Sequence, residues 1–332
     1  MNKKYLTEIF TGIRPTGGLT VANYLGAVRP IVELQKKFTP LVFVADIHGL
    51  TDKEPKEVGQ YVEGVVADYL ALGLNPSKTN IYLQSAVAGE VSFLTLILSR
   101  LTTVSELLRV PTLKDKLKNK DNPEVANALL FFYPVLMAAD ILLNKAERVP
   151  VGEDQLAHLE ITRRLAEKFN KKYGDIFPLP QTQEMKALRV LSLKGEGKMS
   201  KSIPAGAIFL TDDLKTIEKK IKSAETAFEG EMTPKLKSHI LITKELATEK
   251  EDLKKVDDLI KEHEAGKAVL GEFKKVMSKV VIEFIDNFQK KRLEIVKDKD
   301  YVRSILEKGN KIAKENATKT INDVLKTMDF YR

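Results

Sequence analysis

Lysine and serine side chains alternate in one short stretch that begins with two glycines. The stretch reads Gly195-Glu196-Gly197-Lys198-Met199-Ser200-Lys201-Ser202. Glycine permits positive φ and close approach of the backbone, which predicts a mobile loop. Lysine presents a flexible point charge that suits phosphates, and serine hydroxyls add donors. The stretch therefore predicts a loop that folds over a polyphosphate. On composition alone, a solvated basic turn is the simpler alternative.

A second set of polar side chains lies near the N-terminus, where residues 5–10 predict a strand and residues 12–18 a glycine-rich turn. A helix is expected to begin near Val21. A helix that starts directly after a strand and such a turn is a common anion-binding arrangement, because its first backbone N–H groups point at the ligand. Thr20 and Asn23 could donate hydrogen bonds to phosphates there, or they could simply cap the helix.

One carboxylate stands in strongly apolar sequence. Asp140 lies between Met137-Ala138-Ala139 and Ile141-Leu142-Leu143. Carboxylates are rarely buried without a partner, so this side chain needs either an ion pair or a ligand that donates to it. The ion pair could involve Lys145 or a distant arginine. The spacing alone favours such a structural ion pair.

The stretches above belong to a longer pattern. Lys198-Met199-Ser200-Lys201-Ser202 matches the KMSKS signature of class I aminoacyl-tRNA synthetases letter for letter. Upstream of it stand, in order, Gly12-Ile13-Arg14-Pro15-Thr16-Gly17, Thr20-Val21-Ala22-Asn23-Tyr24-Leu25-Gly26-Ala27, Tyr133-Pro134-Val135-Leu136-Met137-Ala138-Ala139-Asp140-Ile141-Leu142-Leu143 and Val149-Pro150-Val151-Gly152-Glu153-Asp154-Gln155. Together these blocks resemble the tryptophanyl-tRNA synthetase family, and the resemblance covers nearly the whole chain.

The resemblance implies a ligase that joins L-tryptophan to tRNA(Trp) through a tryptophanyl-adenylate. ATP with Mg²⁺ is the implied co-substrate, with no other cofactor, and the implied assembly is a homodimer with tRNA laid across both subunits. Ala22 departs from the family pattern, which has glycine there. Three alternatives stay open: a tyrosyl-tRNA synthetase, a small-molecule nucleotidyltransferase that shares the ATP site, and a non-catalytic tRNA-binding paralogue, which only Ala22 suggests.

The resemblance also assigns residues to ATP and to catalysis. The residues implied to be catalytic are Lys198, Ser200, Lys201, Thr20, Asn23 and Lys116; Lys114 is a weaker candidate beside Lys116, since surface lysines are usually just solvated. The residues implied to bind ATP are Arg14, Pro15, Thr16, Gly17, Thr20, Asn23, Gly152, Asp154, Val190, Lys198, Met199, Ser200 and Lys201. Helix capping by acidic residues would also explain the turn that holds Asp154.

For tryptophan, the resemblance makes Asp140 the acceptor for the indole N–H, a group that can only donate. Small residues at 138 and 139 leave room for a ring. Tyr133 and Gln155 are implied to hold the α-amino group. The remaining residues implied to line the tryptophan pocket are Phe10, Gly12, His48, Met137, Ile141, Val149 and Val151.

Composition limits the class of protein. The 332 residues include no cysteine, which excludes disulfides, thiolate zinc sites and iron–sulfur clusters, and the four histidines are scattered, so we expect no metal site. No apolar run is long enough to span a membrane, and no secretory signal opens the chain, so a cytoplasmic location is expected. The net charge of +8 suits a polyanionic partner or merely a soluble surface.

The order of predicted elements indicates an α/β fold with a parallel sheet. Strands are expected at residues 5–10, 41–45, 80–84 and 148–151, with a last strand at 190–193. Helices are expected from Pro55 and over residues 153–169, and residues 89–145 read as a helical insertion. We expect a Rossmann-type catalytic domain over residues 1–207. Residues 208–332 are expected to form a helical anticodon-recognition domain, with the apolar stripes of its long helices as a bundle core.

Overall fold

Five parallel strands form one sheet in the order β3-β2-β1-β4-β5. The computed structural model describes residues 7–15, 17–118, 127–152 and 155–330. In that part of the chain the strands are β1 (Thr7–Ile13), β2 (Leu41–Val44), β3 (Asn80–Leu83), β4 (Ala146–Pro150) and β5 (Gln181–Gln183). Strand β1 pairs with β2 on one side and β4 on the other, so the strand order reverses at β1. Residues 5 and 6, where the first strand was expected to start, lie outside the described residues.

Helices cover the sheet on both sides, as the alternation of elements predicts. After β1 the chain continues as one helical segment of three parts, and the later helices follow each strand in turn. Their bounds are α1 (Val21–Asn23), the π-helical η1 (Tyr24–Val28), α2 (Arg29–Leu34), α3 (Asp46–Gly49), α4 (Pro55–Ala71), the 3₁₀ turn η2 (Gln84–Val87), α5 (Ala88–Ser99), α6 (Val104–Leu108), α7 (Pro111–Lys118), α8 (Ala128–Leu143) and α9 (Leu156–Tyr173). The segment expected to be a helical insertion thus holds α5 to α8.

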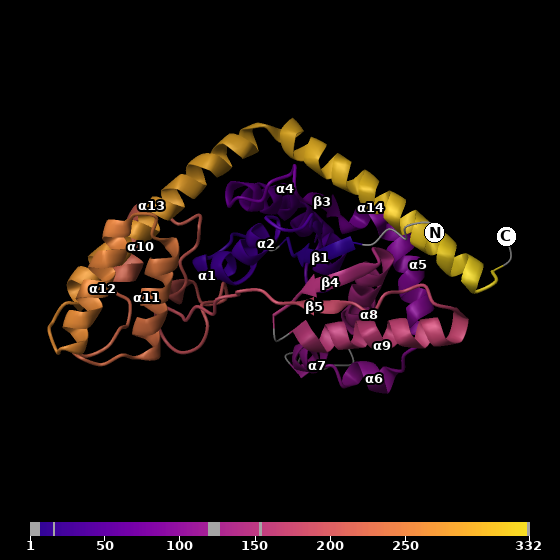
Figure 1. Cartoon of the computed structure of the whole chain (residues 1–332), viewed down its shortest axis with the longest axis horizontal. Helices are drawn as coiled ribbons and strands as arrows, with labels where there is room; N and C mark the ends of the chain where they lie inside the picture. Colours follow the sequence, from indigo (N-terminus) through magenta and orange to yellow (C-terminus); the bar gives the residue numbers. More distant parts are fainter. Residues whose placement is uncertain (1–6, 16, 119–126, 153–154, 331–332) are drawn as a thin grey trace.

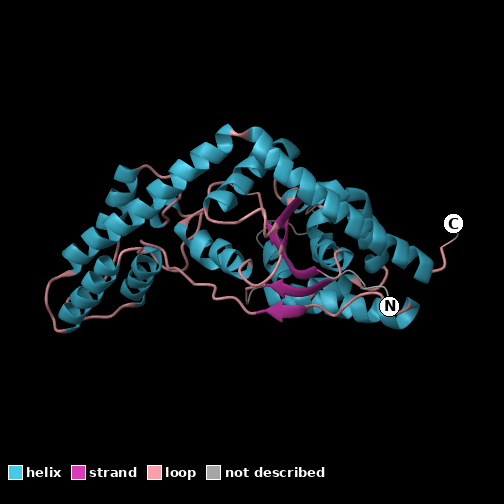
Figure 2. Ribbon diagram, turned by 45° about the horizontal axis from the view of Figure 1, so that its top comes forward, coloured by secondary structure: helices cyan, strands magenta, loops and turns pink. Residues whose placement is uncertain are grey.

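The remainder of the chain is helical after β5. Its elements are the 3₁₀ turn η5 (Pro204–Gly206), α10 (Leu214–Lys222), α11 (Pro234–Leu246), α12 (Lys250–Glu264), α13 (Leu270–Lys297) and α14 (Lys299–Thr327). Helices α10 to α13 gather at one end of the molecule, away from the sheet (Figure 1). The strands all lie in the other part (Figure 2). No helix in the described ranges combines the length and the apolar character needed to cross a membrane.

Helix α14 lies outside that bundle, so the prediction that its whole apolar stripe forms a bundle core is wrong. Val302, Ile305 and Leu306 are buried in the cluster shared with the bundle helices, whereas Ala313, Ala317 and Val324 are buried in the cluster around the sheet. Helix α13 rises from the bundle and α14 descends along the sheet domain, so that the two helices form an arch (Figure 1). Helix α14 packs on β3, at the edge of the sheet. A Cβ on Gly309 would lie 1.8 Å from the carbonyl oxygen of Ile81, so only glycine allows this approach. The side-chain oxygen of Asn310 accepts a hydrogen bond from the backbone N–H of Leu83, at 2.9 Å.

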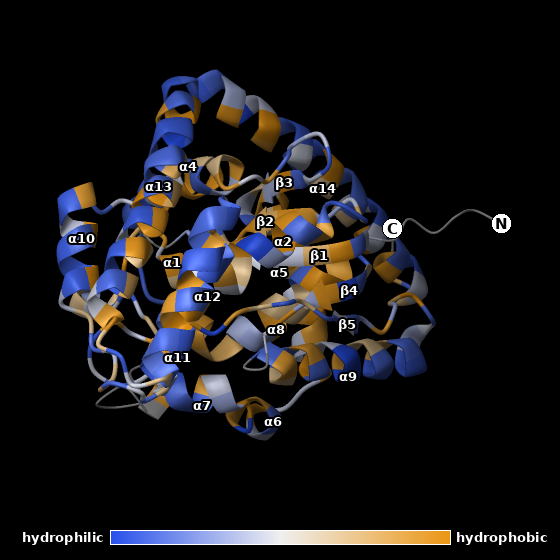
Figure 3. Ribbon diagram, turned by 60° about the vertical axis from the view of Figure 1, so that its left-hand side comes forward, coloured by the Kyte–Doolittle hydropathy of each residue, from blue (hydrophilic) through white to orange (hydrophobic). Residues whose placement is uncertain are grey.

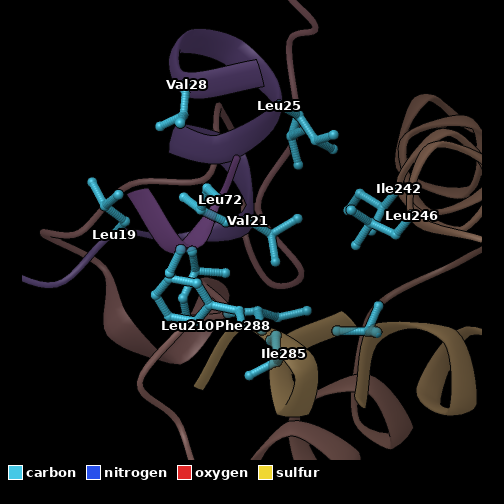
Figure 4. Packing of buried hydrophobic residues seen from close by; sticks show 14 of the residues in the cluster. Leu19, Val21, Leu25, Val28, Leu72, Leu210, Ile242, Leu246, Ile285 and Phe288 are labelled. Atoms are coloured by element: carbon cyan, nitrogen blue, oxygen red, sulfur yellow. The ribbon is translucent and has the colours of Figure 1, made fainter. Parts of the chain in front are cut away.

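Two hydrophobic cores result. One lies between the sheet and helices α5, α8, α9 and α14, and it contains Phe10, Phe43 and Ile141. The other joins the opposite face of the sheet to the helical bundle, and in Figure 4 Val21, Leu25, Ile242, Leu246, Ile285 and Phe288 gather within it. Helices α9 and α12 turn hydrophilic faces outward (Figure 3). Burial of apolar area in these cores stabilises both parts and their junction.

The expected last strand at residues 190–193 is also wrong. Leu191 forms only an isolated antiparallel bridge with Lys198, outside the sheet. Val190 and Leu193 are buried in the core shared with the bundle, which explains their apolar character without a strand. The fifth strand is instead the polar segment of β5, whose side chains are largely exposed at the edge of the sheet. Apolar periodicity cannot reveal such a strand.

Candidate active site

A cavity of about 520 Å³ opens at the carboxyl ends of β1 and β4. Strand order reverses between these two strands, and the crevice at such a switch point is the usual ligand site of parallel α/β sheets. The end of β1 contributes Gly12, and Arg14 follows it; the end of β4 contributes Val149, and Val151 and Gly152 follow it. The topology of the sheet therefore forms the cavity.

The residues predicted for the tryptophan pocket come together here, with one exception. The cavity is lined by Phe10, Gly12, His48, Tyr133, Met137, Ile141, Val149, Val151 and Gln155, which come from β1, α3, α8, β4 and the start of α9. Phe10 stacks on Phe43 at 5.0 Å between ring centroids. A Cβ on Gly12 would lie 2.5 Å from the Phe43 ring, so glycine there lets the ring sit against the strand.

Asp140, the exception, lies one layer behind the cavity wall. Its side chain is 1% exposed, and its carboxylate accepts hydrogen bonds from His48 and Gln84. The His48 Nε2 atom is 2.9 Å from Oδ2, and the Gln84 Nε2 atom is 2.9 Å from Oδ1 and 2.8 Å from Oδ2. Burial raises the pKa of Asp140, and the contacts with His48 and Gln84 oppose that rise. Lys145, one possible ion-pair partner in the alternative reading of Asp140, forms an ion pair with Asp323.

The orientation of the Gln84 amide is fixed by a second bond. Its Oε1 atom accepts from the backbone N–H of His48 at 3.1 Å, so its NH₂ group must face Asp140. Gln84 is fully buried, and the sequence analysis missed it. Its position directly after the carboxyl end of β3 is the signal that could have identified it.

Thr112, Tyr133 and His158 form a second hydrogen-bonded polar group in the cavity wall. The hydroxyl of Thr112 is 2.7 Å from the Tyr133 hydroxyl and 2.6 Å from the His158 Nε2 atom. The Tyr133 hydroxyl oxygen is 3.3 Å from the same His158 Nε2 atom. Thr112 and His158 also line the cavity and were not predicted. The ammonium of Lys116 lies 4.7 Å from the centroid of the Tyr133 ring. Burial and nearby Arg14 lower the pKa of Lys116.

Thr20 and Asn23 form a capping box at the start of α1. The Thr20 hydroxyl accepts from the Asn23 backbone N–H at 3.2 Å, and the Asn23 side chain accepts from the Thr20 backbone N–H at 3.0 Å. The capping alternative of the sequence analysis is therefore present. Thr20 is buried, and its backbone bridges Phe209, which ties this helix start to the chain just after the lysine loop.

The two lysines of the loop have different surroundings. Lys198 is exposed, whereas Lys201 is half-buried and donates to the carbonyl oxygen of Gly17 at 3.2 Å. Burial lowers the pKa of Lys201, and the charge of Asp68 opposes that effect. Asp68 is itself buried and forms an ion pair with Arg292 of α13 at 2.5 Å. Lys201 thus lies at the glycine-rich turn after β1.

The other residues predicted to bind ATP are dispersed. Arg14 and Gly152 line the cavity, and Arg14 forms an ion pair with Asp52 at 2.7 Å. Pro15, Val190 and Met199 are buried, and the Ser200 hydroxyl bonds that of Ser202. Lys114 is exposed. Thr16 and Asp154 lie outside the described residues. The described residues contain no group of three or more histidine, aspartate or glutamate side chains arranged to hold a metal ion.

Comparisons with known proteins give a consistent result. The family model described as "tRNA synthetases class I (W and Y)" matches residues 2–286. The tryptophan–tRNA ligase of Bacillus subtilis is 38% identical over 97% of this chain and 96% of its own length. The tryptophan–tRNA ligase of Chlamydia caviae is 35% identical over 100% of this chain and 98% of its own length.

Solved structures agree. Tryptophanyl-tRNA synthetase from Campylobacter jejuni, complexed with ADP and tryptophan, is 31% identical with a TM-score of 0.84, covering 98% of this chain and 100% of that one. The synthetase from Mycoplasma pneumoniae is 30% identical with the same TM-score, covering 98% of both chains.

Proposed function

The chain belongs to the class I tRNA synthetases of the W and Y family, and we propose that it ligates L-tryptophan to tRNA(Trp) with ATP. The carboxylate of tryptophan attacks the α-phosphorus of ATP, the bond to the departing pyrophosphate breaks, and a tryptophanyl-adenylate forms. A terminal hydroxyl of the tRNA then attacks the acyl carbon, and AMP leaves. The observation that carries the proposal is the cavity between β1 and β4, which brings together the residues of the expected pocket apart from Asp140.

Asp140 is proposed to accept the indole N–H of tryptophan. An ionised carboxylate offers about four acceptor positions. Among the described residues, Oδ1 accepts only from Gln84, while Oδ2 accepts from Gln84 and His48. An acceptor position on Oδ1 therefore remains. The bound ring would approach Asp140 beside His48, which lines the cavity and contacts the Asp140 carboxylate.

Tyr133 and Gln155 are proposed to hold the α-ammonium at the other side of the cavity. Both line it, and Tyr133 presents a hydroxyl that is fixed by neighbours. The apolar side chains of Phe10, Ile141 and Val149 would then enclose the indole between the two polar ends. Such a pocket, mostly apolar with few polar groups, is typical of small-molecule sites.

ATP is proposed to bind at the turn after β1 and the start of the helical segment over residues 21–34. Lys201 already contacts this turn through Gly17, so its charge is available for the β- and γ-phosphates. Thr20, Asn23, Lys116 and Lys198 would add donors and charge. Preorganised charge of this kind stabilises the negative charge that develops on departing pyrophosphate. Mg²⁺ would enter with ATP, held mainly by phosphate oxygens.

The division of the chain stays a proposal, with residues 1–207 as the catalytic domain and 208–332 as the part that reads the anticodon. Helices α10 to α13 supply a separate surface for the tRNA, while α14 returns to the sheet domain. We further propose a homodimer. A cytoplasmic location would follow from the role of charged tRNA in translation.

The test is exchange of labelled pyrophosphate into ATP in the presence of single amino acids. We expect exchange with L-tryptophan and little with L-tyrosine, followed by charging of tRNA(Trp). Exchange that depends on tyrosine would support the tyrosyl alternative. Absence of amino-acid-dependent exchange would favour the nucleotidyltransferase or the non-catalytic paralogue.

A further inference from the structure

Three side chains from three successive helices meet behind the proposed ammonium site. Thr112 comes from α7, Tyr133 from α8 and His158 from α9. The distances of 2.7 Å, 2.6 Å and 3.3 Å between their polar atoms close a triangle of hydrogen bonds. The rings of Tyr133 and His158 also pack edge to face at 5.3 Å. His158 is 1% exposed and Tyr133 is 7% exposed, so water contributes little to this group.

The chemistry of the ligand restricts the orientation of the Tyr133 hydroxyl. An α-ammonium group carries only donors, so the phenolic oxygen must accept from it. The phenolic proton must then point elsewhere, and the acceptors beside it are the Thr112 hydroxyl and the His158 ring. We propose that Thr112 and His158 are positioning residues that accept the Tyr133 proton and leave the Tyr133 oxygen as an acceptor for the ammonium. This inference rests on the proposed function, and specifically on the role of Tyr133.

The charges around the site make such a device necessary. Lys116 lies over the Tyr133 ring, and Arg14 lines the same cavity. Asp52 pairs with Arg14, so Lys116 is the main cation that repels a further positive charge, and acceptors already oriented when the ammonium arrives offset this repulsion. Burial raises the pKa of Tyr133, which keeps its proton in place and requires a partner for it. A hydroxyl free to rotate would present its proton to the ammonium part of the time.

The experiment compares three ligands that share the indole ring. L-Tryptophan has the ammonium and the carboxylate, tryptamine has only the ammonium, and indole-3-propionate has only the carboxylate. Their fluorescence reports binding directly, because the chain has no tryptophan. We expect Thr112→Val to weaken binding of tryptophan and tryptamine by about three- to tenfold, the effect of one neutral hydrogen bond. Binding of indole-3-propionate should not change.

Control variants separate positioning from packing. Thr112→Ser keeps the hydroxyl and should recover most of the affinity for the two amines. Thr95→Val, which removes a similar half-buried hydroxyl from α5, should change none of the three affinities. In a Tyr133→Phe background, Thr112→Val should have no further effect, because the group through which it acts is gone. If the valine variant does not fold, Thr112→Ala replaces it.

Two results would overturn the inference while leaving the proposed function intact. One is an equal loss of affinity for all three ligands, or no loss, in the Thr112 variants. The other is a selective loss for the amines that persists in the Tyr133→Phe background. Wild-type protein that binds none of the three ligands would instead refute the proposed function, and with it this inference.

Discussion

Replacement of Asp140 by asparagine should expose how the pocket selects its substrate. Asparagine has nearly the size of aspartate but turns one acceptor oxygen into an NH₂ donor. Gln84 cannot turn its amide to compensate, since its Oε1 atom is held by the His48 backbone N–H. The single oxygen left at position 140 offers two acceptor positions, but three donors compete for them: Gln84, His48 and the indole N–H.

One buried donor is therefore left unpaired when tryptophan binds. An unsatisfied buried donor costs about 1–3 kcal/mol. That free energy corresponds to a loss of affinity of about five- to 150-fold. We expect a loss near the middle of this range, because Asp140 and Gln84 are almost completely buried and water cannot replace the missing acceptor.

The assay is the fluorescence of added L-tryptophan, excited where tyrosine absorbs little. An analogue in which benzothiophene replaces indole carries sulfur in place of the N–H and is measured by competition. It should bind the native protein poorly, because a site built around one substrate hydrogen bond discriminates against ligands that lack it. In Asp140→Asn the difference in affinity between tryptophan and the analogue should largely disappear.

Asp46 offers a matched control. It also lies at the end of a strand, but its carboxylate bonds Ser85 and does not line the cavity. Asp46→Asn should leave the preference for tryptophan over the analogue unchanged. Native protein that binds both ligands equally, or Asp140→Asn that weakens both equally, would refute the assignment of Asp140 to the indole N–H.

Four further outcomes are expected. Lys201→Ala should lower kcat of adenylate formation about 10²-fold with little change in the KM for tryptophan, measured by pyrophosphate exchange. In the same assay, native protein should be active, and Ala22→Gly should leave the KM for ATP equal or lower; inactivity reversed by this change would favour the non-catalytic paralogue. Gly309→Ala should destabilise the fold by about 3 kcal/mol or more in urea unfolding, because the added Cβ would clash with the backbone of Ile81. Gly271→Ala should stabilise α13 slightly, because its added Cβ meets open space. Burial lowers the pKa of His239 from 6.5 to about 4, so the unfolded chain binds the proton more readily than the folded chain. The free energy of unfolding should therefore be highest above pH 6.5 and should fall by up to about 3 kcal/mol towards pH 4. His239→Leu should reduce this loss.

The central part of the fold could be predicted from the sequence because its signals are local. The four residues of β2 form a continuous apolar run that reports burial on both faces. Strands β1 and β4 end at glycine and proline motifs, so the residues that follow them could be assigned to the cavity. The parallel sheet then brings these distant segments together without further information.

The remaining features depend on tertiary contacts that no local pattern encodes. Gln84, Thr112 and His158 are ordinary polar residues in sequence. Only the packing of their helices buries Gln84 and His158 and brings Thr112 to the wall of the cavity. The apolar stripe of α14 predicts that one face is covered, but not by what. The same limit explains the error at residues 190–193, where an apolar run packs against helices rather than in the sheet.

The contact between α14 and β3 has a consequence for biosynthesis. Strand β3 (Asn80–Leu83) leaves the ribosome long before α14 (Lys299–Thr327), the helix that covers it. Until then the sheet presents an unprotected edge that other strands could join, and unpaired edges favour aggregation of nascent chains. A chain that terminates before α14 would retain the cavity residues and still carry this open edge. Its defect would therefore appear first as insolubility and only secondarily as lost catalysis.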